Sequence, residues 1–338
     1  MLSEIWTEKM RNRIRKTHLS RTFAGNEFEG VIITNFDSVA EDIAEREWVV
    51  VTGRVHPGES NSSYIVEGII RYLISDEEPA VKLRNKFVFK VVPMLNPDGV
   101  IIGNYRWSLT GSDLNRQWKN PSARLHPEIY ALKEMFLKTL KWRRVFWYVD
   151  CHGHSRKKNA FMYGWSNKNA AGYQKYKEKV IPFMFEYNNE SFSFKDCNFT
   201  VQKAREGTGR FVVHSEYNVI NSYTLEASFF GPDKGLYQDW HFTPTQLSDI
   251  GRNFWITLHD YAWMMQNPRA KIWLSNRSFG IAIDLQRVYE EIDKFFGNGK
   301  EIQSKNYLKF ISKGDESDSA DDDEPEIWHI SKSKYFIS

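Results

Sequence analysis

The sequence WVVVTGRVHPGESN, residues 48–61, largely decides how this chain folds. Its first half is a strand-length run of aromatic and β-branched residues, and a Pro-Gly turn follows. A helical pattern then covers Asn61–Ser75, with apolar residues recurring at every fourth position. A buried strand that leads through a tight turn into an amphipathic helix is typical of an α/β protein.

The same alternation continues along the chain. Further runs of strand character are Val31–Thr34, Phe87–Pro93, Val145–Cys151, Phe199–Gln202, Phe211–His214 and Ser222–Ser228. Helical patterns are found over about 127–140, 174–186 and 244–265, and one more helix is expected near Asp284–Phe296. This pattern predicts an α/β fold in which a central sheet is covered by helices on both faces.

Composition and charge limit the possible functions. Of the 338 residues 41% are hydrophobic, which is enough for a large core, and no apolar run reaches the ~18–20 residues that cross a bilayer. The 46 basic and 43 acidic residues give +3, but eight acids and two basic residues follow Gly314, so residues 1–314 carry +9. A positive charge of this size favours anionic partners. Charge alone does not decide whether the partner is a nucleic acid, a membrane or an acidic peptide. The two cysteines suit a reducing compartment.

Histidines and acids follow two of the predicted strands. His56 and Glu59 lie three apart in a turn and can offer a nitrogen and an oxygen to one metal ion. The alternative is a surface turn with Glu59 near a helix N-terminus. His152 ends another apolar strand, and ligands of open α/β sheets bind beyond such ends. Asp150 is a candidate to orient His152, and His154 is expected to be a pocket histidine that does not bind the metal.

Two other regions carry polar residues that are candidates for catalysis or substrate binding. Arg106, Asn115 and Arg116 share the loop-rich stretch 94–118, where a guanidinium can bind a carboxylate bidentately or stabilise an oxyanion. Glu226 interrupts a run of strand residues, where an unpaired buried carboxylate would be costly. The alternative for Glu226 is a half-exposed side chain that faces solvent.

Together these motifs resemble the M14 zinc carboxypeptidases, and within them the cytosolic carboxypeptidases that remove glutamate from tubulin and other proteins. The similar strings are RVHPGESN (54–61), VPMLNPDGV (92–100), DLNRQW (113–118), HGHSRKKN (152–159) and EGTGR (206–210). The resemblance runs in order from about Arg21 to Tyr261. It implies a single mixed central sheet with helices on both faces.

The resemblance also implies roles for the polar residues. The ligands of one Zn²⁺ per chain would be His56, Glu59 and His152. The catalytic residues would be the base Glu226 and the oxyanion stabiliser Arg106. The residues that bind the terminal carboxylate of the substrate would be Asn115 and Arg116.

A preference for glutamate requires a cation in the pocket for the substrate side chain. Arg210 is the leading candidate, because it lies close before the strand that carries Glu226. Lys203 and Arg205 come next, with a solvated edge as their alternative role. His154 is expected to line the substrate site as well. The tyrosine that closes over substrate in secreted relatives has no counterpart that the sequence identifies.

The expected organisation is an N-terminal segment (1–20), a catalytic domain (21–265), a C-terminal extension (266–313) and an acidic, disordered tail (314–338). Family members usually carry a β-sandwich domain before the catalytic domain. Only about twenty residues precede the first matching segment here, so we expect that domain to be missing.

We therefore expect a cytoplasmic zinc metallocarboxypeptidase, associated with microtubules or cilia. It would hydrolyse C-terminal or branch glutamates of acidic protein tails such as polyglutamylated tubulin, without nucleic-acid or membrane partners. One alternative is a small-molecule deacylase of the same fold, although residues 110–118 and 205–210 match the peptidases better. The other is an inactive module that binds acidic tails, although all the catalytic side chains are present.

Overall fold

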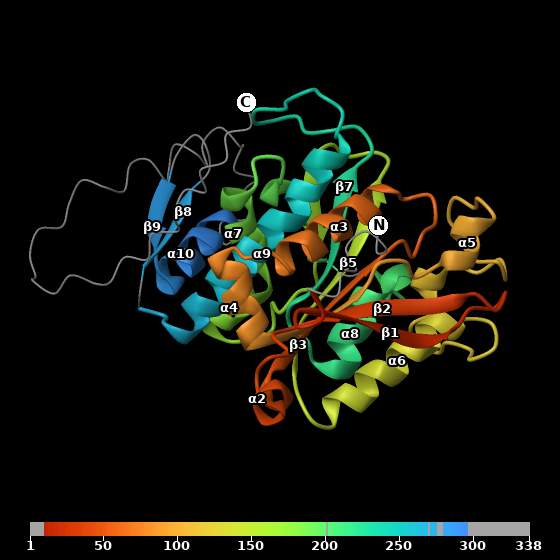
Figure 1. The fold of residues 1–338 in the computed structure, drawn as a ribbon. Coiled ribbons are helices and arrows are strands. Elements are labelled where there is room, and N and C mark those ends of the chain that lie inside the picture. The colour runs from red at the N-terminus through yellow and green to blue at the C-terminus, as the bar shows by residue number, and fades with distance from the viewer. Residues whose placement is uncertain (1–9, 201, 270, 276–279, 297–338) are drawn as a thin grey trace, which may run out of the picture.

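The computed structural model describes residues 10–296, except 201, 270 and 276–279. Its centre is a seven-stranded sheet, and a two-stranded sheet lies near the end of the described chain (Figure 1). The strands of the central sheet are β1 (Ile14–Arg21), β2 (Glu27–Ile33), β3 (Glu47–Gly53), β4 (Phe87–Val92), β5 (Val145–His154), β6 (Ala160–Tyr163) and β7 (Ser222–Ser228). Their order in space is β1-β2-β4-β3-β5-β7-β6.

The four inner strands β4, β3, β5 and β7 run parallel, so their carboxyl ends meet at one edge of the sheet. β2 and β6 flank them in antiparallel pairings, and β1 completes a hairpin with β2. The predicted mixed sheet is confirmed. Every residue of β4 and β7 is buried, as expected for strands that are covered on both faces.

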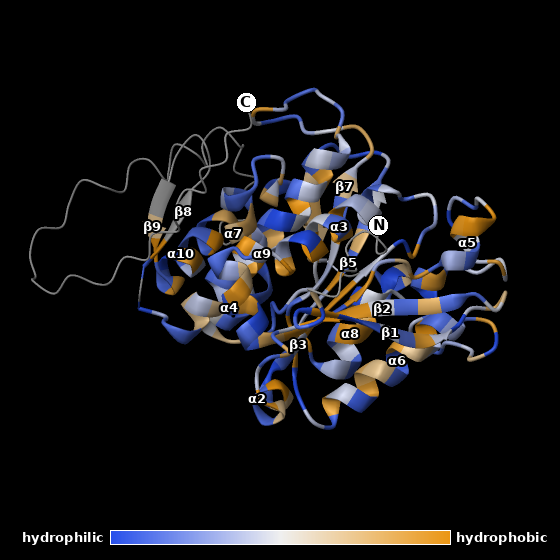
Figure 2. Ribbon diagram, in the orientation of Figure 1, coloured by the Kyte–Doolittle hydropathy of each residue, from blue (hydrophilic) through white to orange (hydrophobic). Residues whose placement is uncertain are grey.

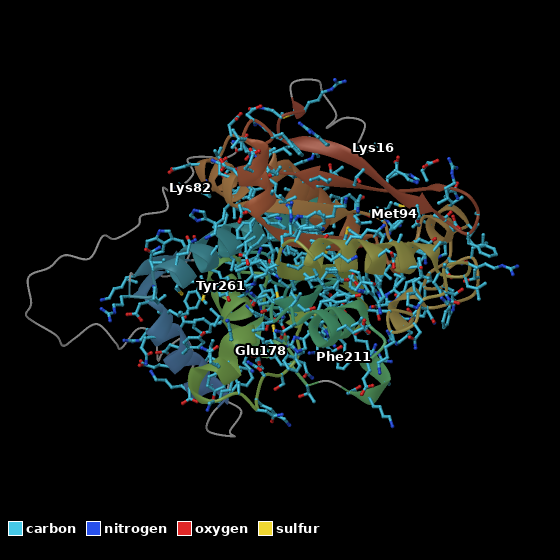
Figure 3. The ribbon with its side chains drawn as sticks, turned by 90° about the horizontal axis from the view of Figure 1, so that it is seen from below. Lys16, Lys82, Met94, Glu178, Phe211 and Tyr261 are labelled. Carbon is cyan, nitrogen blue, oxygen red and sulfur yellow. The ribbon has the colours of Figure 1, made fainter. Side chains whose placement is uncertain are left out.

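Helices cover both faces of the sheet. One layer contains α3 (Asn61–Leu73), α4 (Glu78–Lys86), α7 (Val180–Asn188), α9 (Pro244–Gln266) and α10 (Leu285–Phe296). The other contains α6 (Pro127–Leu140) and α8 (Gly209–Tyr217). Tyr261 of α9 and Phe211 of α8, labelled in Figure 3, belong to these two layers. In Figure 2 the helices carry both orange and blue along their length, and orange is prominent in the central strands.

Alternation along β3 separates the two cores. Val49 and Val51 pack with α3 and α9, whereas Val50 packs with α6 and α8. The same rule puts Thr52, the next residue of this parity, on the side of α6 and α8. Polar residues at the ends of the inner strands therefore collect in one layer.

Two predicted strands are wrong. Phe211–His214 belongs to α8. A short apolar run fits a helix and a strand equally well, and here the buried residues follow the spacing of a helix. Residues 199, 200 and 202 lie outside any strand. The predicted helix over 174–186 is divided into a 3-10 helix, Gly172–Lys179, and α7.

Several predictions concern the end of the chain. The helix expected near Asp284–Phe296 is α10, and the short strands β8 (Ile272–Ser275) and β9 (Gly280–Ile283) precede it. The acidic tail predicted for 314–338, and the extension after 296, lie outside the described residues. None of the helices in the described part of the chain is long and apolar enough to cross a membrane.

Candidate active site

Three buried side chains meet at the carboxyl edge of the sheet. His56 and Glu59 come from the turn after β3, and His152 comes from β5; their donor atoms lie within 4.8 Å of one another. The Glu59 Oε1 atom is 2.6 Å from His56 Nδ1, and Oε2 is 2.8 Å from His152 Nδ1. Burial alone would raise the pKa of Glu59, but the two histidines hold this pKa below its ordinary value.

This donor set fits the metal that the sequence predicts. Two imidazole nitrogens and one carboxylate are a known ligand set of catalytic zinc, and they leave one coordination position open for water or substrate. Among the described residues, His56, Glu59 and His152 form the one such group of three.

Both histidines turn their outer nitrogen toward a carboxylate. His152 Nε2 lies 2.8 Å from Asp150 Oδ2, and His56 Nε2 lies 3.2 Å from Asp113 Oδ1. The Thr52 hydroxyl in turn donates a hydrogen bond of 2.7 Å to Asp150 Oδ1. A carboxylate at Nε2 fixes the proton there and leaves Nδ1 as the ligand atom.

Glu226 lies beside the cluster on β7, where the register places it opposite His152 of β5. We call the side of the sheet that faces α6 and α8 the site face. It carries Thr52, Asp150, His152, Thr224 and Glu226. The Glu226 side chain is buried, and its Oε2 atom has no hydrogen-bond partner in the described part of the chain. Burial raises the pKa of Glu226 to about 7, although the His152 imidazole opposes this rise.

Three predicted substrate and oxyanion residues lie next to the cluster. Asp113 Oδ2 accepts hydrogen bonds from Arg106 Nε and Nη2, at 3.0 and 2.6 Å. Arg116 Nη1 is 3.9 Å from the same oxygen. Asn115 Nδ2 lies 3.4 Å from His152 Nε2. The Asn115 backbone N–H donates to Asp113 Oδ1 at 2.9 Å. The structure therefore brings Arg106, Asn115 and Arg116 together around the Asp113 carboxylate.

Two glycines let the start of α8 and the residues before it pack closely against the loop that carries Asn115 and Arg116. A Cβ atom at Gly207 would lie 2.5 Å from the Arg116 carbonyl oxygen, and one at Gly209 would lie 2.6 Å from the Tyr148 hydroxyl. The Gly209 N–H donates to Asn115 Oδ1 at 3.0 Å. The string EGTGR thus fixes the start of α8 against the loop of Asn115 and Arg116.

Arg210 is a buried cation close to Glu226. Its side chain is 6% exposed, and Nε and Nη1 have no hydrogen-bond partner in the described part of the chain. Burial lowers the pKa of Arg210 to about 10, and the nearby Glu226 opposes this fall. A buried donor without an acceptor is costly, so this guanidinium is suited to receive an anion. Lys203 and Arg205 are exposed in a 3-10 helix, Lys203–Arg205.

His154, at the end of β5, does not belong to the metal cluster. Its Nδ1 atom accepts hydrogen bonds from the backbone N–H groups of Arg156 and Lys157, at 3.2 and 2.9 Å. Burial lowers the pKa of His154, so the neutral ring carries its proton on Nε2. The partly exposed ring packs edge-on against Phe161 and presents Nε2–H as a donor.

The profile of the zinc carboxypeptidase family, Peptidase M14, matches residues 4–278. The chain belongs to this family. The predicted resemblance to the M14 zinc carboxypeptidases is confirmed.

Within the M14 family, the chain is similar to cytosolic carboxypeptidases. Cytosolic carboxypeptidase 2 of Mus musculus is 46% identical over 244 residues, which cover 72% of this chain and 28% of that protein. The Xenopus tropicalis protein of the same name is 43% identical over 274 residues, covering 81% and 27%. Cytosolic carboxypeptidase 3 of Mus musculus is 41% identical over 264 residues, covering 77% and 26%. The chain thus spans a little more than a quarter of the length of these curated relatives, and the predicted subfamily is confirmed.

Solved structures of metallo-carboxypeptidases share the fold. A metallo-carboxypeptidase from Pseudomonas aeruginosa has a TM-score of 0.66 at 20% identity, covering 75% of this chain and 65% of that one. A metallo-carboxypeptidase from Burkholderia cenocepacia has a TM-score of 0.63 at 21% identity, covering 76% and 66%. The predicted zinc carboxypeptidase fold is confirmed.

Sequence reasoning did not single out Asp113. This residue joins the cluster of His56, Glu59 and His152 to Arg106, because one of its oxygens faces His56 and the other accepts from Arg106. The histidine and Arg106 hold the pKa of Asp113 below its ordinary value, against the effect of burial. Its position two residues before Asn115 was the available signal.

Proposed function

We propose that the chain is a zinc metallocarboxypeptidase that hydrolyses C-terminal or branch glutamates from acidic protein tails such as polyglutamylated tubulin. Membership of the M14 family supports the reaction class. The observation that carries the proposal is the metal-ligand cluster of His56, Glu59 and His152, which lies beside the unpaired oxygen of Glu226. We assign the catalytic domain to residues 21–265.

Different residues of this chain carry out different steps of the proposed reaction. Bound zinc would supply a Lewis acid that acidifies water and polarises the scissile carbonyl. Glu226 takes the proton of the attacking water on Oε2 and passes it to the leaving amine. Arg106 stabilises the negative charge that develops on the carbonyl oxygen. Its Nε and Nη2 atoms are held by Asp113, and this leaves Nη1 for the substrate.

Recognition of the C-terminus requires donors for two carboxylates. Asn115 and Arg116 bind the terminal α-carboxylate, and Arg116 Nη1 is held in place by a hydrogen bond of 2.8 Å to the Asn115 carbonyl. Arg210 binds the carboxylate of a glutamate side chain, because its guanidinium is buried and has two atoms without partners. His154 Nε2–H is available to a backbone carbonyl of the substrate.

The proposed cellular location and partner are supported by the relatives and by the charge. The names of the related cytosolic carboxypeptidases support a cytoplasmic location. Within the cytoplasm, we propose that the protein associates with microtubules or cilia. The +9 charge of residues 1–314 favours an acidic tail as partner over a neutral peptide.

Glutamate release from a polyglutamylated tubulin peptide tests the proposal. The purified protein is incubated with the peptide, with and without a chelator, and free glutamate is quantified. We expect release that stops with the chelator and returns with added zinc. A matched peptide that ends in alanine is the specificity control. Release that persists with a chelator, or no release with zinc, would contradict the proposal.

A further inference from the structure

Tyr163, the last residue of β6, lies on the site face. β6 pairs antiparallel with β7, with Phe161 opposite Glu226 and Tyr163 opposite Thr224. Residues two apart on a strand share one face, so the Tyr163 side chain is on the same side of the sheet as the Glu226 carboxylate. No sequence motif pointed to this residue.

Contacts hold the Tyr163 ring beside the buried cation. The Arg210 Cζ atom is 5.5 Å from the centre of the Tyr163 ring, and the Phe161 ring packs edge-on against it at 5.4 Å. α8 places Arg210 over the site face, so Tyr163 and Arg210 approach the base from two different elements. A ring fixed by two neighbours offers its hydroxyl in a defined position.

The hydroxyl of Tyr163 is a protonated donor without a partner. Burial raises the pKa of Tyr163, and the charge of Glu226 acts in the same direction. The side chain is half-buried, and none of the hydrogen bonds in the described part of the chain involves its hydroxyl. A phenol that shares the site face with Glu226 and contacts the guanidinium of Arg210, which has two unpartnered nitrogens, can therefore donate to an anion bound at that guanidinium.

We propose that the Tyr163 hydroxyl donates a hydrogen bond to the side-chain carboxylate of the substrate's C-terminal glutamate, so that Tyr163 and Arg210 bind this carboxylate together. The inference rests on the proposed function and adds a second specificity-determining residue to it. Arg210 supplies the charge, and Tyr163 supplies a directed donor from the neighbouring strand β6. A hydrogen bond to a charged acceptor is about twice as strong as one between neutral groups, so an acidic side chain gains most.

The test compares two peptides that differ only in the last residue, glutamate or methionine, which are similar in length. Tyr163→Phe removes the hydroxyl and keeps the ring over Arg210. We expect kcat/KM for the glutamate peptide to fall about tenfold or more, and kcat/KM for the methionine peptide to change less than about twofold. Tyr130→Phe, which removes an exposed hydroxyl on α6, is the matched control.

Every outcome decides the question. An equal fall for both peptides would mean that Tyr163 acts on Glu226 or on the fold, and would overturn the inference. Unchanged kinetics for both peptides would overturn it too. Thermal unfolding of Tyr163→Phe separates loss of folding from loss of the hydrogen bond. Wild-type protein that releases no glutamate contradicts the proposed function as well, whereas a wild-type preference for glutamate that survives in Tyr163→Phe contradicts this inference alone.

Discussion

Asp150 Oδ2 lies 2.8 Å from the Nε2 atom of His152, and both side chains are almost completely buried. The other oxygen of Asp150 is held by Thr52, whose hydroxyl is 3.2 Å from that of Tyr148. A carboxylate anchored in this way fixes the imidazole with Nδ1 toward the metal position and raises its basicity. Asp150 should therefore control metal affinity without touching the metal.

Asp150→Asn is expected to weaken zinc binding about 10- to 100-fold, because the amide keeps the size of the side chain and loses its charge. Competition with a chromophoric chelator measures the affinity directly. Asp76→Asn, at a carboxylate whose side chain is 86% exposed, serves as the control and should bind zinc like the wild type. Equal affinity in Asp150→Asn and the wild type would rule out this role.

Glu226→Gln should separate catalysis from metal binding. The amide is nearly isosteric with the carboxylate but cannot accept the water's proton, so kcat should fall about 10²–10⁴-fold or more. Zinc content and thermal stability should stay at the wild-type level, since Glu226 Oε2 makes no hydrogen bond that the substitution would break. Near-normal kcat would assign the base to another residue.

The sequence alone predicted those parts of the site where a metal-binding or acidic residue stands next to a clear strand or helix pattern. The strand of residues 48–52 and the helix from Asn61 fix the turn that carries His56 and Glu59, so their approach to one point was predictable. Glu226 was conspicuous because a carboxylate in a buried strand is costly. Strings that match a known family supplied the remaining assignments, which pattern alone left open.

Other parts of the site depend on three-dimensional register. β6 is four residues long and gave no periodic signal, so its pairing with β7, and with it the position of Tyr163, was not predictable. α8 was mistaken for a strand because Phe211–His214 is short and apolar, and this hid the burial of Arg210. Whether a cation is paired is decided by packing between distant segments, which no local pattern records.

His214 on α8 predicts how stability depends on pH. The side chain is buried, its ring stacks on Trp165, and its Nδ1–H donates to the Val219 carbonyl at 3.1 Å. Burial lowers the pKa of His214 to about 4, although the hydrogen bond to Val219 opposes this. Between pH ~6.5 and ~4 the unfolded chain binds the proton and the native chain does not, so the free energy of unfolding falls as the pH falls through this range.

Urea unfolding at several pH values measures this contribution. The wild type should lose on the order of 2 kcal/mol through His214 between pH ~6.5 and ~4, and the full contribution should be present above pH ~6.5. His214→Phe keeps an aromatic ring and removes the titration, so its stability should depend less steeply on pH in this range. His18→Phe removes an exposed histidine and is the control. Identical slopes for His214→Phe and the wild type would contradict the prediction.

Arg210→Ala should remove the preference for glutamate. A substrate carboxylate that enters a buried pocket without its cation is penalised by about 2–5 kcal/mol, so kcat/KM for a glutamate peptide should fall about 100-fold or more. For a peptide ending in alanine the fall should stay within about tenfold, because no charge needs compensation there. Arg210→Lys keeps the charge without the planar fork and should lie between the two. An equal loss for both peptides would make Arg210 structural and turn attention to Lys203 and Arg205, the exposed cations nearby.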